Sequence, residues 1–180
     1  NFKEENPFVS PTMYIMPTNQ QYNGFAGIKG KLTNTLAYNL RTSYGKEDDK
    51  ALFVMNPSKE MIPGLEGYEY GNSFQIAYDE LTTLSVFGEL NLEISDNFSM
   101  GISATFNSFD TKNQPEAWNL PTLEASLFSN FNISKKLYGG VSLFYVGERK
   151  DFLVGEVGPF SLPYAEIVTL DAYIDANAHL

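Results

Sequence analysis

The sequence predicts an all-β protein, an antiparallel up-and-down transmembrane β-barrel segment of about seven strands that is part of a larger barrel. Three observations predict this fold class. Apolar and polar residues alternate over long stretches, these stretches exceed the ~5–6 residues usual in soluble strands, and the tight turns and long connections fall at opposite ends of the predicted strands.

The alternation is clearest between residues 84 and 109. Side chains two positions apart lie on one face of a strand. That face carries the apolar residues Leu84, Val86, Leu90, Leu92 and Ile94 in the first arm, and Phe98, Met100, Ile102, Ala104 and Phe106 in the second. The turn formers Ser95-Asp96-Asn97 separate the arms, so we expect one long hairpin with an apolar and a polar face.

The other elements follow in chain order. Residues 1–21 hold Pro7, Pro11 and Pro17, so we expect an irregular Pro-containing connection there. Residues 22–180 form the predicted partial outer-membrane β-barrel, with hairpins over 22–46, 73–109 and 120–149 and a last strand over 166–180. Its tight turns are Thr33-Asn34-Thr35, Ser95-Asp96-Asn97 and Ser134-Lys135-Lys136, and its long connections are Gly45–Asn72, Asp110–Asn119 and Lys150–Ala165.

If each tight turn spans three residues, the register of the hairpins can be written out. The predicted pairs are Leu32 with Leu36, Gly30 with Tyr38, Ile28 with Leu40, Ile133 with Leu137 and Phe131 with Gly139. Glycine then faces an aromatic residue twice, and Gly24 would meet Tyr44 in the same way. A ring lying over a glycine fills the space of the missing side chain and helps to hold the register.

Composition restricts the function. With 12 Lys and Arg against 22 Asp and Glu, the chain of 180 residues carries a net charge of -10, which argues against nucleic-acid binding. No cysteine and a single histidine argue against disulfides and against a zinc or iron site built from these residues. No stretch reaches the ~18 apolar residues of a membrane helix, whereas 14 Phe, 11 Tyr and one Trp suit a barrel with aromatic girdles.

We expect the chain to be an excised segment of a longer protein, because it begins at Asn1 rather than Met and ends on an unfinished strand at Leu180. An open sheet would also leave two unpaired edges in hydrocarbon, so further strands are expected outside this segment. A soluble β-sandwich stays open as an alternative, because its core would give the same alternation.

The polar faces of the predicted strands provide the candidate lumen-facing residues. These are Lys29, Arg41, Phe87, Glu89, Glu93, Glu124, Phe128, Phe144, Glu148, Asp171 and Asp175. Charged side chains are normal in a water-filled or protein-filled barrel interior. The three phenylalanines are better explained if a plug, a loop or a sugar ring covers them.

No nucleophile elbow, phosphate loop or metal-ligand spacing is present, so we expect neither an enzyme nor a cofactor. Asp171, Asp175 and His179 share one strand face, but positions four apart lie ~13 Å from each other, too far to share one ion unaided. Glu47, Asp48 and Asp49 could bind calcium in a loop, although a solvated charge run is the more ordinary explanation.

Several segments resemble the later barrel strands of TonB-dependent outer-membrane receptors. They are Gly-Phe-Ala-Gly-Ile-Lys-Gly-Lys-Leu (24–32), Ser-Val-Phe-Gly-Glu-Leu-Asn (85–91), Glu-Ala-Trp-Asn-Leu-Pro (116–121), Phe-Tyr-Val-Gly-Glu-Arg-Lys (144–150) and the final stretch 169–180. The resemblance implies a barrel of about twenty-two strands that is closed by a plug and imports a scarce nutrient, such as a siderophore, glycan or peptide.

The resemblance also implies the partners and the location of the protein. The partners would be outer-membrane lipid, a plug domain, the remaining barrel strands, the TonB system and the nutrient, and the location would be the outer membrane of a Gram-negative bacterium. The alternative is a non-transport structural or adhesive β-protein, either a loop-displaying outer-membrane barrel or a soluble β-sandwich. A plug-like domain encoded upstream would favour the receptor.

Overall fold

The computed structural model describes residues 17–55, 74–134, 137–157 and 162–179. No helix in this part of the chain is long and apolar enough to span a membrane. The described residues form the strands β1 (Gln20–Lys31), β2 (Leu36–Met55), β3 (Phe74–Ser95), β4 (Phe98–Thr111), β5 (Leu123–Ser134), β6 (Leu137–Val146), β7 (Arg149–Val157), β8 (Leu162–Leu170) and β9 (Tyr173–His179).

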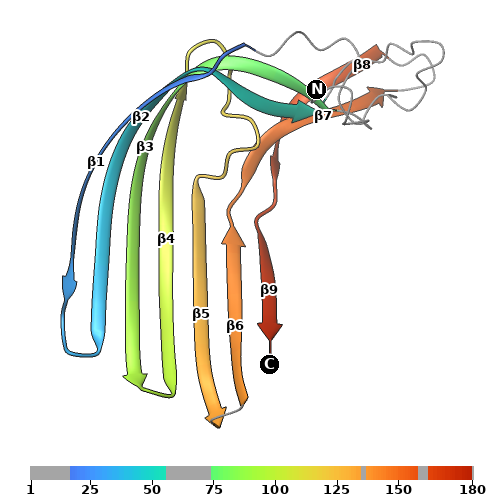
Figure 1. Cartoon of the computed structure of the whole chain (residues 1–180). Coiled ribbons are helices and arrows are strands. Elements are labelled where there is room, and N and C mark those ends of the chain that lie inside the picture. Colours follow the sequence, from blue (N-terminus) through green and yellow to red (C-terminus); the bar gives the residue numbers. More distant parts are fainter. Residues whose placement is uncertain (1–16, 56–73, 135–136, 158–161, 180) are drawn as a thin grey trace.

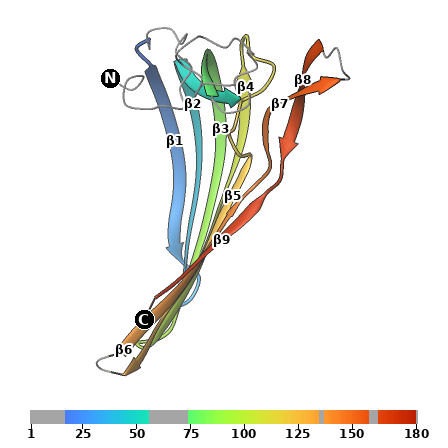
Figure 2. The same cartoon turned by 90° about the vertical axis from the view of Figure 1, so that its right-hand side faces the viewer.

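Seven strands form one antiparallel sheet in the order β1-β2-β3-β4-β5-β6-β9, and β7 pairs with β8 in a separate two-stranded hairpin. Figure 1 shows the sheet as a single layer of long neighbouring strands, and Figure 2 shows from the side that the layer is curved and twisted. The predicted fold class is therefore confirmed: the chain is all-β, with seven strands in the arrangement of a partial up-and-down barrel.

The two ends of the sheet differ in their connections. The turns after β1 and β3 lie at one end, which we call the turn end, and the longer connections lie at the other, which we call the loop end (Figure 1). At the first turn the Thr33 hydroxyl oxygen accepts hydrogen bonds from the N–H groups of Leu36 (3.0 Å) and Thr35 (3.2 Å). Short polar turns of this kind close a hairpin without further contacts.

The predicted register is confirmed along most of the ladder. Gly30 pairs with Tyr38, Ile28 with Leu40 and Phe131 with Gly139. A Cβ added at Gly30 would lie 3.0 Å from Cε1 of Tyr38, and one at Gly139 would lie 2.7 Å from Cε2 of Phe131. At both positions the ring occupies the space that the glycine leaves, as expected.

Two details of the register prediction are wrong. Leu137 pairs with Ser134 rather than with Ile133, because a bulge after Asn132 takes up one residue. Gly24 does pair with Tyr44, but nothing lies within 4 Å of a Cβ built at Gly24, so the ring does not cover this glycine. The gap beside Gly24 therefore remains open.

Strand boundaries also differ from the prediction. The expected connection Lys150–Ala165 contains most of the β7–β8 hairpin, and the expected single strand 166–180 is broken at residues 171–172, because β8 pairs with β7 whereas β9 pairs with β6. Alternation alone does not reveal a change of partner. The expected connection 1–21 lies mostly outside the described residues, and its description as a separate region stays a prediction.

The apolar face of the seven-stranded sheet is exposed. Ile28, Val86 and Ile102 are 62%, 51% and 51% exposed. No second sheet covers this face among the described residues, because each strand of the sheet contacts its neighbours and only β2 also touches β7. A soluble β-sandwich would bury these side chains against a second sheet. The described residues provide no second sheet over this face.

The loop end of β2 extends beyond the expected hairpin 22–46, to Met55, whereas β3 begins at Phe74, within the expected hairpin 73–109. A bulge between Glu47 and Lys50 places two residues of β2 opposite Glu80 alone, and Asp49 adopts a φ of 55°. Because an extra residue shifts the alternation by one, the even-numbered residues of β2 change face at this point. The predicted polar connection Gly45–Asn72 therefore begins with strand, and its last residues, 56–72, lie outside the described residues.

Candidate ligand-binding site at the loop end of the polar face

The pairing places most of the predicted site residues on one continuous polar face, opposite the apolar one. These are Lys29, Arg41, Phe87, Glu89, Glu93, Glu124, Phe128, Phe144 and Asp175. The other two, Glu148 and Asp171, lie in breaks between strands rather than in the ladder. That this face lines a lumen stays a prediction.

The middle of the polar face is cross-linked by side-chain contacts. The guanidinium carbon of Arg41 lies 5.3 Å from the centre of the Phe87 ring, a cation–π contact. Asn39 Nδ2 donates to Glu89 Oε2 at 3.2 Å. The ring of Phe128 lies so close to Gly101 that no Cβ fits there. Four of the predicted residues, Arg41, Phe87, Glu89 and Phe128, are thus in contact with neighbouring residues of this face.

A small apolar core lies at the loop end. Trp118, Leu52 and Val54 are at most 2% exposed and pack together, with Ala77 and Leu120 against them. Leu52 and Val54 reach this core because the bulge has turned them to the inner side of the sheet. We call the loop-end ribbon of β2 and β3 (residues 50–55 and 74–79), the connection 112–122 and the start of β7 the cap.

One carboxylate fastens the connection 112–122 to β3. Asp79 is 3% exposed and accepts hydrogen bonds from the N–H groups of Asn113 (2.8 Å), Gln114 (2.7 Å) and Glu80 (2.9 Å), and from Asn113 Nδ2 (2.7 Å). Burial raises the pKa of Asp79, but these hydrogen bonds to the charged form outweigh it and hold the pKa below its ordinary value. Gln114 in turn accepts a bond from the Trp118 indole N–H at 2.9 Å.

A second carboxylate joins the cap to β7. Asp151 accepts hydrogen bonds from the Met55 N–H (3.0 Å) and from Asn119 Nδ2 (2.8 Å). Asn119 Nδ2 also donates to the Phe53 carbonyl oxygen at 3.0 Å, and the Asn119 N–H donates to the Lys150 carbonyl oxygen at 2.9 Å. Asn119 has a φ of 57°, which asparagine tolerates better than most residues.

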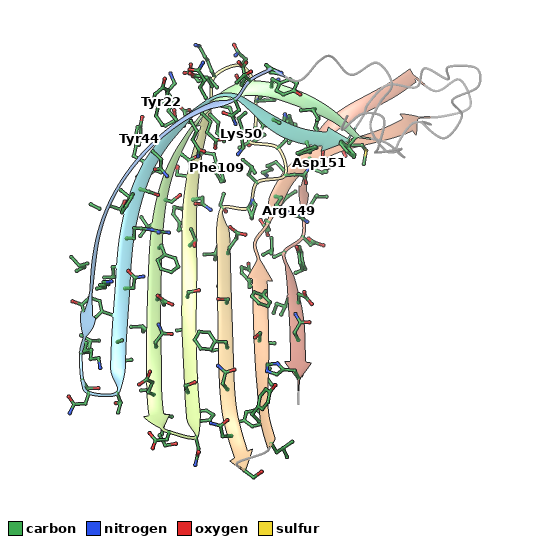
Figure 3. The ribbon with its side chains drawn as sticks, viewed as in Figure 1. Tyr22, Tyr44, Lys50, Phe109, Arg149 and Asp151 are labelled. Atoms are coloured by element: carbon green, nitrogen blue, oxygen red, sulfur yellow. The ribbon has the colours of Figure 1, made fainter. Side chains whose placement is uncertain are left out.

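A cavity of about 300 Å³ lies beneath the cap on the polar face. Its lining comes from the loop ends of β1 to β5 and from the cap: Gln21, Asn23, Ser43, Gly45, Glu47, Lys50, Leu81, Thr83, Ser85, Asn107, Phe109, Leu120, Pro121 and Glu124. Figure 3 shows Lys50 and Phe109 below the arch that the loop ends of β2 and β3 form. Its size is at the lower end of the ~300–1,000 Å³ of small-molecule sites, so this cavity is the candidate ligand-binding site.

A cluster of ion pairs lies at the same height on the opposite side of the sheet. Glu80 lies 3.0 Å from Lys46 Nζ and 3.3 Å from Lys112 Nζ. The hydrogen bond to Lys46 lowers the pKa of Glu80, and the same bond raises the pKa of Lys46. The side chains of Lys46, Glu80 and Lys112 are 43%, 30% and 62% exposed, so we ascribe little stability to these ion pairs.

The described residues support neither metal hypothesis. Among them, no three His, Cys, Asp or Glu side chains gather closely enough to hold an ion. Glu47 forms an ion pair with Lys50 at 3.1 Å and accepts a hydrogen bond from Asn19 Nδ2 at 3.1 Å, while Asp48 lies 3.8 Å from Lys46. Two of the three acidic side chains, Glu47 and Asp48, thus have neighbouring donors.

Sequence reasoning missed the residues that build the cap. Asp79 and Asp151 look like ordinary polar positions of a strand and of a loop, and Trp118 was assigned only to a connection. The available signal was the pattern Trp118-Asn119-Leu120-Pro121, in which a large ring, an asparagine and two apolar residues interrupt a polar loop. Phe109, on the predicted polar face, was also overlooked because it ends the expected hairpin.

No protein-family model and no curated protein sequence matches the chain. Its fold, however, matches solved structures. The pyoverdine outer membrane receptor FpvA from Pseudomonas aeruginosa PAO1, solved bound to pyoverdine, is 15% identical with a TM-score of 0.55 over 96% of this chain and 25% of the receptor. The FpvAI–pyocin S2 complex gives 17% identity and a TM-score of 0.54 over 89% of this chain and 20% of that chain.

The copper transporter OprC gives 12% identity and a TM-score of 0.50 over 88% of this chain and 22% of the transporter. The chain thus spans a fifth to a quarter of the length of these proteins. They are transport receptors of the Gram-negative outer membrane rather than enzymes. The described chain has the fold of part of the barrel wall of TonB-dependent outer-membrane receptors.

Proposed function

We propose that the chain forms part of the barrel wall of a TonB-dependent outer-membrane receptor that imports a scarce nutrient. The observation that carries this proposal is the exposed apolar face of a single-layer sheet, opposite a polar face with a capped cavity at its loop end. The likeness in fold to outer-membrane receptors supports it. In this proposal the apolar face contacts lipid, the polar face lines the lumen and the loop end faces the outside of the cell.

The dimensions of the apolar face support the assignment to lipid. Leu32 follows Tyr22 by ten residues along β1 and its turn. At ~3.4 Å per residue and a tilt of ~40° this distance corresponds to a height of ~26 Å, close to the ~25 Å apolar band of outer-membrane barrels. Tyr22 and Tyr44 lie near each other at the loop end of the band, where aromatic girdles occur (Figure 3).

A plug domain is the proposed partner of the polar face. Phe144 is 45% exposed and Phe25, which also lies on this face, is 75% exposed. Exposure of such rings to a water-filled pore is unfavourable, whereas a plug would bury them. The predicted rings of Phe87 and Phe128 are half-buried and already contact Arg41 and Gly101, so Phe144 and Phe25 are the better reporters of a plug.

Transport can be tested in a strain that expresses the full-length protein as its only copy. We expect growth on a limiting nutrient to require both this gene and TonB, and we expect the protein in the outer-membrane fraction. Deleting the plug while keeping the barrel should make Phe25→Cys and Phe144→Cys accessible to a water-soluble maleimide. A protein that assembles in the outer membrane but supports no TonB-dependent uptake would favour the loop-displaying barrel instead.

A further inference from the structure

We propose that the cavity beneath the cap binds an uncharged, hydroxyl-rich ring, the chemistry of a sugar unit. This inference takes one assumption from the proposed function, which is that the ligand comes from outside the cell. The argument has three parts, which are the charge of the cavity, a donor that is held in place, and an aromatic ring and a carboxylate in the same lining.

The charges of the lining disfavour an anion. Lys50 is the cation among the described residues that line the cavity, and its ammonium lies 3.1 Å from both carboxylate oxygens of Glu47. Glu124 adds a second carboxylate. An anionic ligand would meet a net negative lining with its one cation already paired, and such like-charge contacts oppose binding. An uncharged ligand avoids this repulsion.

Asn107 offers a prepositioned hydrogen-bond donor. Its side chain is 9% exposed, and its Oδ1 accepts a 2.6 Å hydrogen bond from the Ser85 hydroxyl. Its backbone N–H donates to the Thr122 carbonyl oxygen at 2.8 Å, which fixes the residue at the edge of the connection. With the amide oxygen occupied, the two N–H groups of Nδ2 are the donors that this side chain can give to a ligand hydroxyl.

Phe109 and Glu124 complete the pattern. Phe109 lies two residues after Asn107 on β4, so the ring and the amide come from the same face of one strand. The C–H groups of a sugar ring pack on an aromatic face, while its hydroxyls, which lie around the rim, bond to planar amides and carboxylates. Glu124 supplies the acceptor, and 300 Å³ suits one sugar unit.

The test uses the full-length receptor, extracted from the outer membrane in detergent. Binding of maltotriose, xylotriose and diacetylchitobiose, as neutral probes, is measured by calorimetry and by saturation-transfer NMR, beside trigalacturonate and ferric citrate as anionic probes. We expect at least one neutral probe to bind. Its affinity should fall about tenfold or more in Phe109→Leu and Asn107→Asp, and persist in Phe109→Tyr.

The controls separate binding from folding. Asn107→Asp keeps an oxygen for the Ser85 hydroxyl and replaces the amide donors by a second carboxylate oxygen. Phe106→Ala removes a neighbouring ring on the opposite, apolar face, where Phe106 is 55% exposed, and should leave sugar binding unchanged. The heat-dependent gel shift of folded barrels checks that every variant is assembled.

The outcomes distinguish this inference from the proposed function. If none of the neutral probes binds at about 10 mM, or if an anionic probe binds in a Phe109-dependent manner, the ligand class is wrong while TonB-dependent uptake can still stand. If sugar binds but no uptake depends on TonB, the receptor function is wrong and the cavity assignment stands. Equal loss of binding in Phe106→Ala and Phe109→Leu would also overturn the assignment.

Discussion

The seven-stranded sheet below the cap, which we call the wall, shares β2 and β3 with the cap. The two regions are stabilised in opposite ways. Between Leu36 and Tyr44, β2 follows a regular ladder and turns its apolar side chains outward, where Leu40 and Tyr44 are 48% and 61% exposed. Beyond the bulge, Leu52 and Val54 of the same strand are 1% and 2% exposed and pack on Trp118. The first region depends on its surroundings for burial, whereas the second builds a core of its own.

Within a few residues, β2 thus changes from an exposed apolar face, as expected of a lipid-facing strand, to a buried apolar face, as in a water-soluble domain. In the wall, apolar residues are placed for contact with something outside the chain, and polar ones face inward. In the cap, apolar residues point inward and carboxylates such as Asp79 and Asp151 satisfy backbone N–H groups, as in a water-soluble domain. Substitutions should therefore affect the two regions independently.

The largest effect is expected from Trp118→Ala, which leaves a cavity at the centre of the cap. Large-to-small changes of this kind cost ~3–5 kcal/mol. We expect the amides of residues 112–122 to lose hydrogen-exchange protection while the ladder between Leu36 and Tyr44 keeps its own. Loss of protection throughout the wall as well would show that the two regions are not independent.

Charges placed on the two faces of the wall test this region separately from the cap. Val86→Lys and Leu127→Lys put a cation on the apolar face, at a cost of ~2–4 kcal/mol near the middle of a bilayer, and should reduce outer-membrane assembly. Glu89→Lys, on the polar face beside Val86, is the matched control and should assemble. Equal tolerance of all three variants would contradict the assignment of the faces.

Acidification should detach the connection 112–122 of the cap from β3 and leave the ladder of the wall unchanged. Because the pKa of Asp79 is lowered in the folded state, its contribution to stability is complete above the ordinary pKa of an aspartate, ~3.9, and is lost as the pH falls through the lower folded value. Trypsin cleavage after Lys112 cannot be followed at such a pH, so pepsin digestion or hydrogen exchange of Asn113 and Gln114 is the measurement.

The matched variants for this pH effect are Asp79→Asn and Asp110→Asn. Asp79→Asn should release the connection even at neutral pH, because the amide leaves N–H groups of Asn113 or Gln114 unpaired at ~1–3 kcal/mol. Asp110 is exposed and close by on β4, and its replacement should change nothing. Identical pH profiles of the wild type and Asp79→Asn would contradict the role of this carboxylate.

The smallest effect is expected at the bulge. Asp49 has a positive φ, a conformation that costs ~1–2 kcal/mol for most residues and least for glycine. Asp49→Gly should keep or slightly raise the stability of the cap, whereas Asp49→Val should lower it by ~1 kcal/mol. Thermal melting of the cap, followed by exchange at Met55, measures both, and a stabilising Asp49→Val would exclude the strained backbone as the cause.

Alternation predicted the seven-stranded sheet well because the pleat of a strand sends successive side chains to opposite faces, one apolar and one polar. The pair Gly30–Tyr38 followed from a three-residue turn, whereas Phe131–Gly139 forms because the bulge after Asn132 restores the predicted offset. The cap could not be predicted in this way, since its contacts join residues distant in sequence, such as Asp79 with Gln114 and Asp151 with Met55. The β7–β8 hairpin was missed because Gly and Pro residues suggested a loop.

The bulge at Asp48 and Asp49 also restricts how the length of this segment can change. Deleting one residue between Glu47 and Leu52 would restore the original alternation and send Leu52 and Val54 away from Trp118, and inserting one would do the same. A change of two residues would preserve their orientation. Length variants of this ribbon that keep the packing of the cap should therefore differ by an even number of residues, because only such changes leave each side chain on its original face.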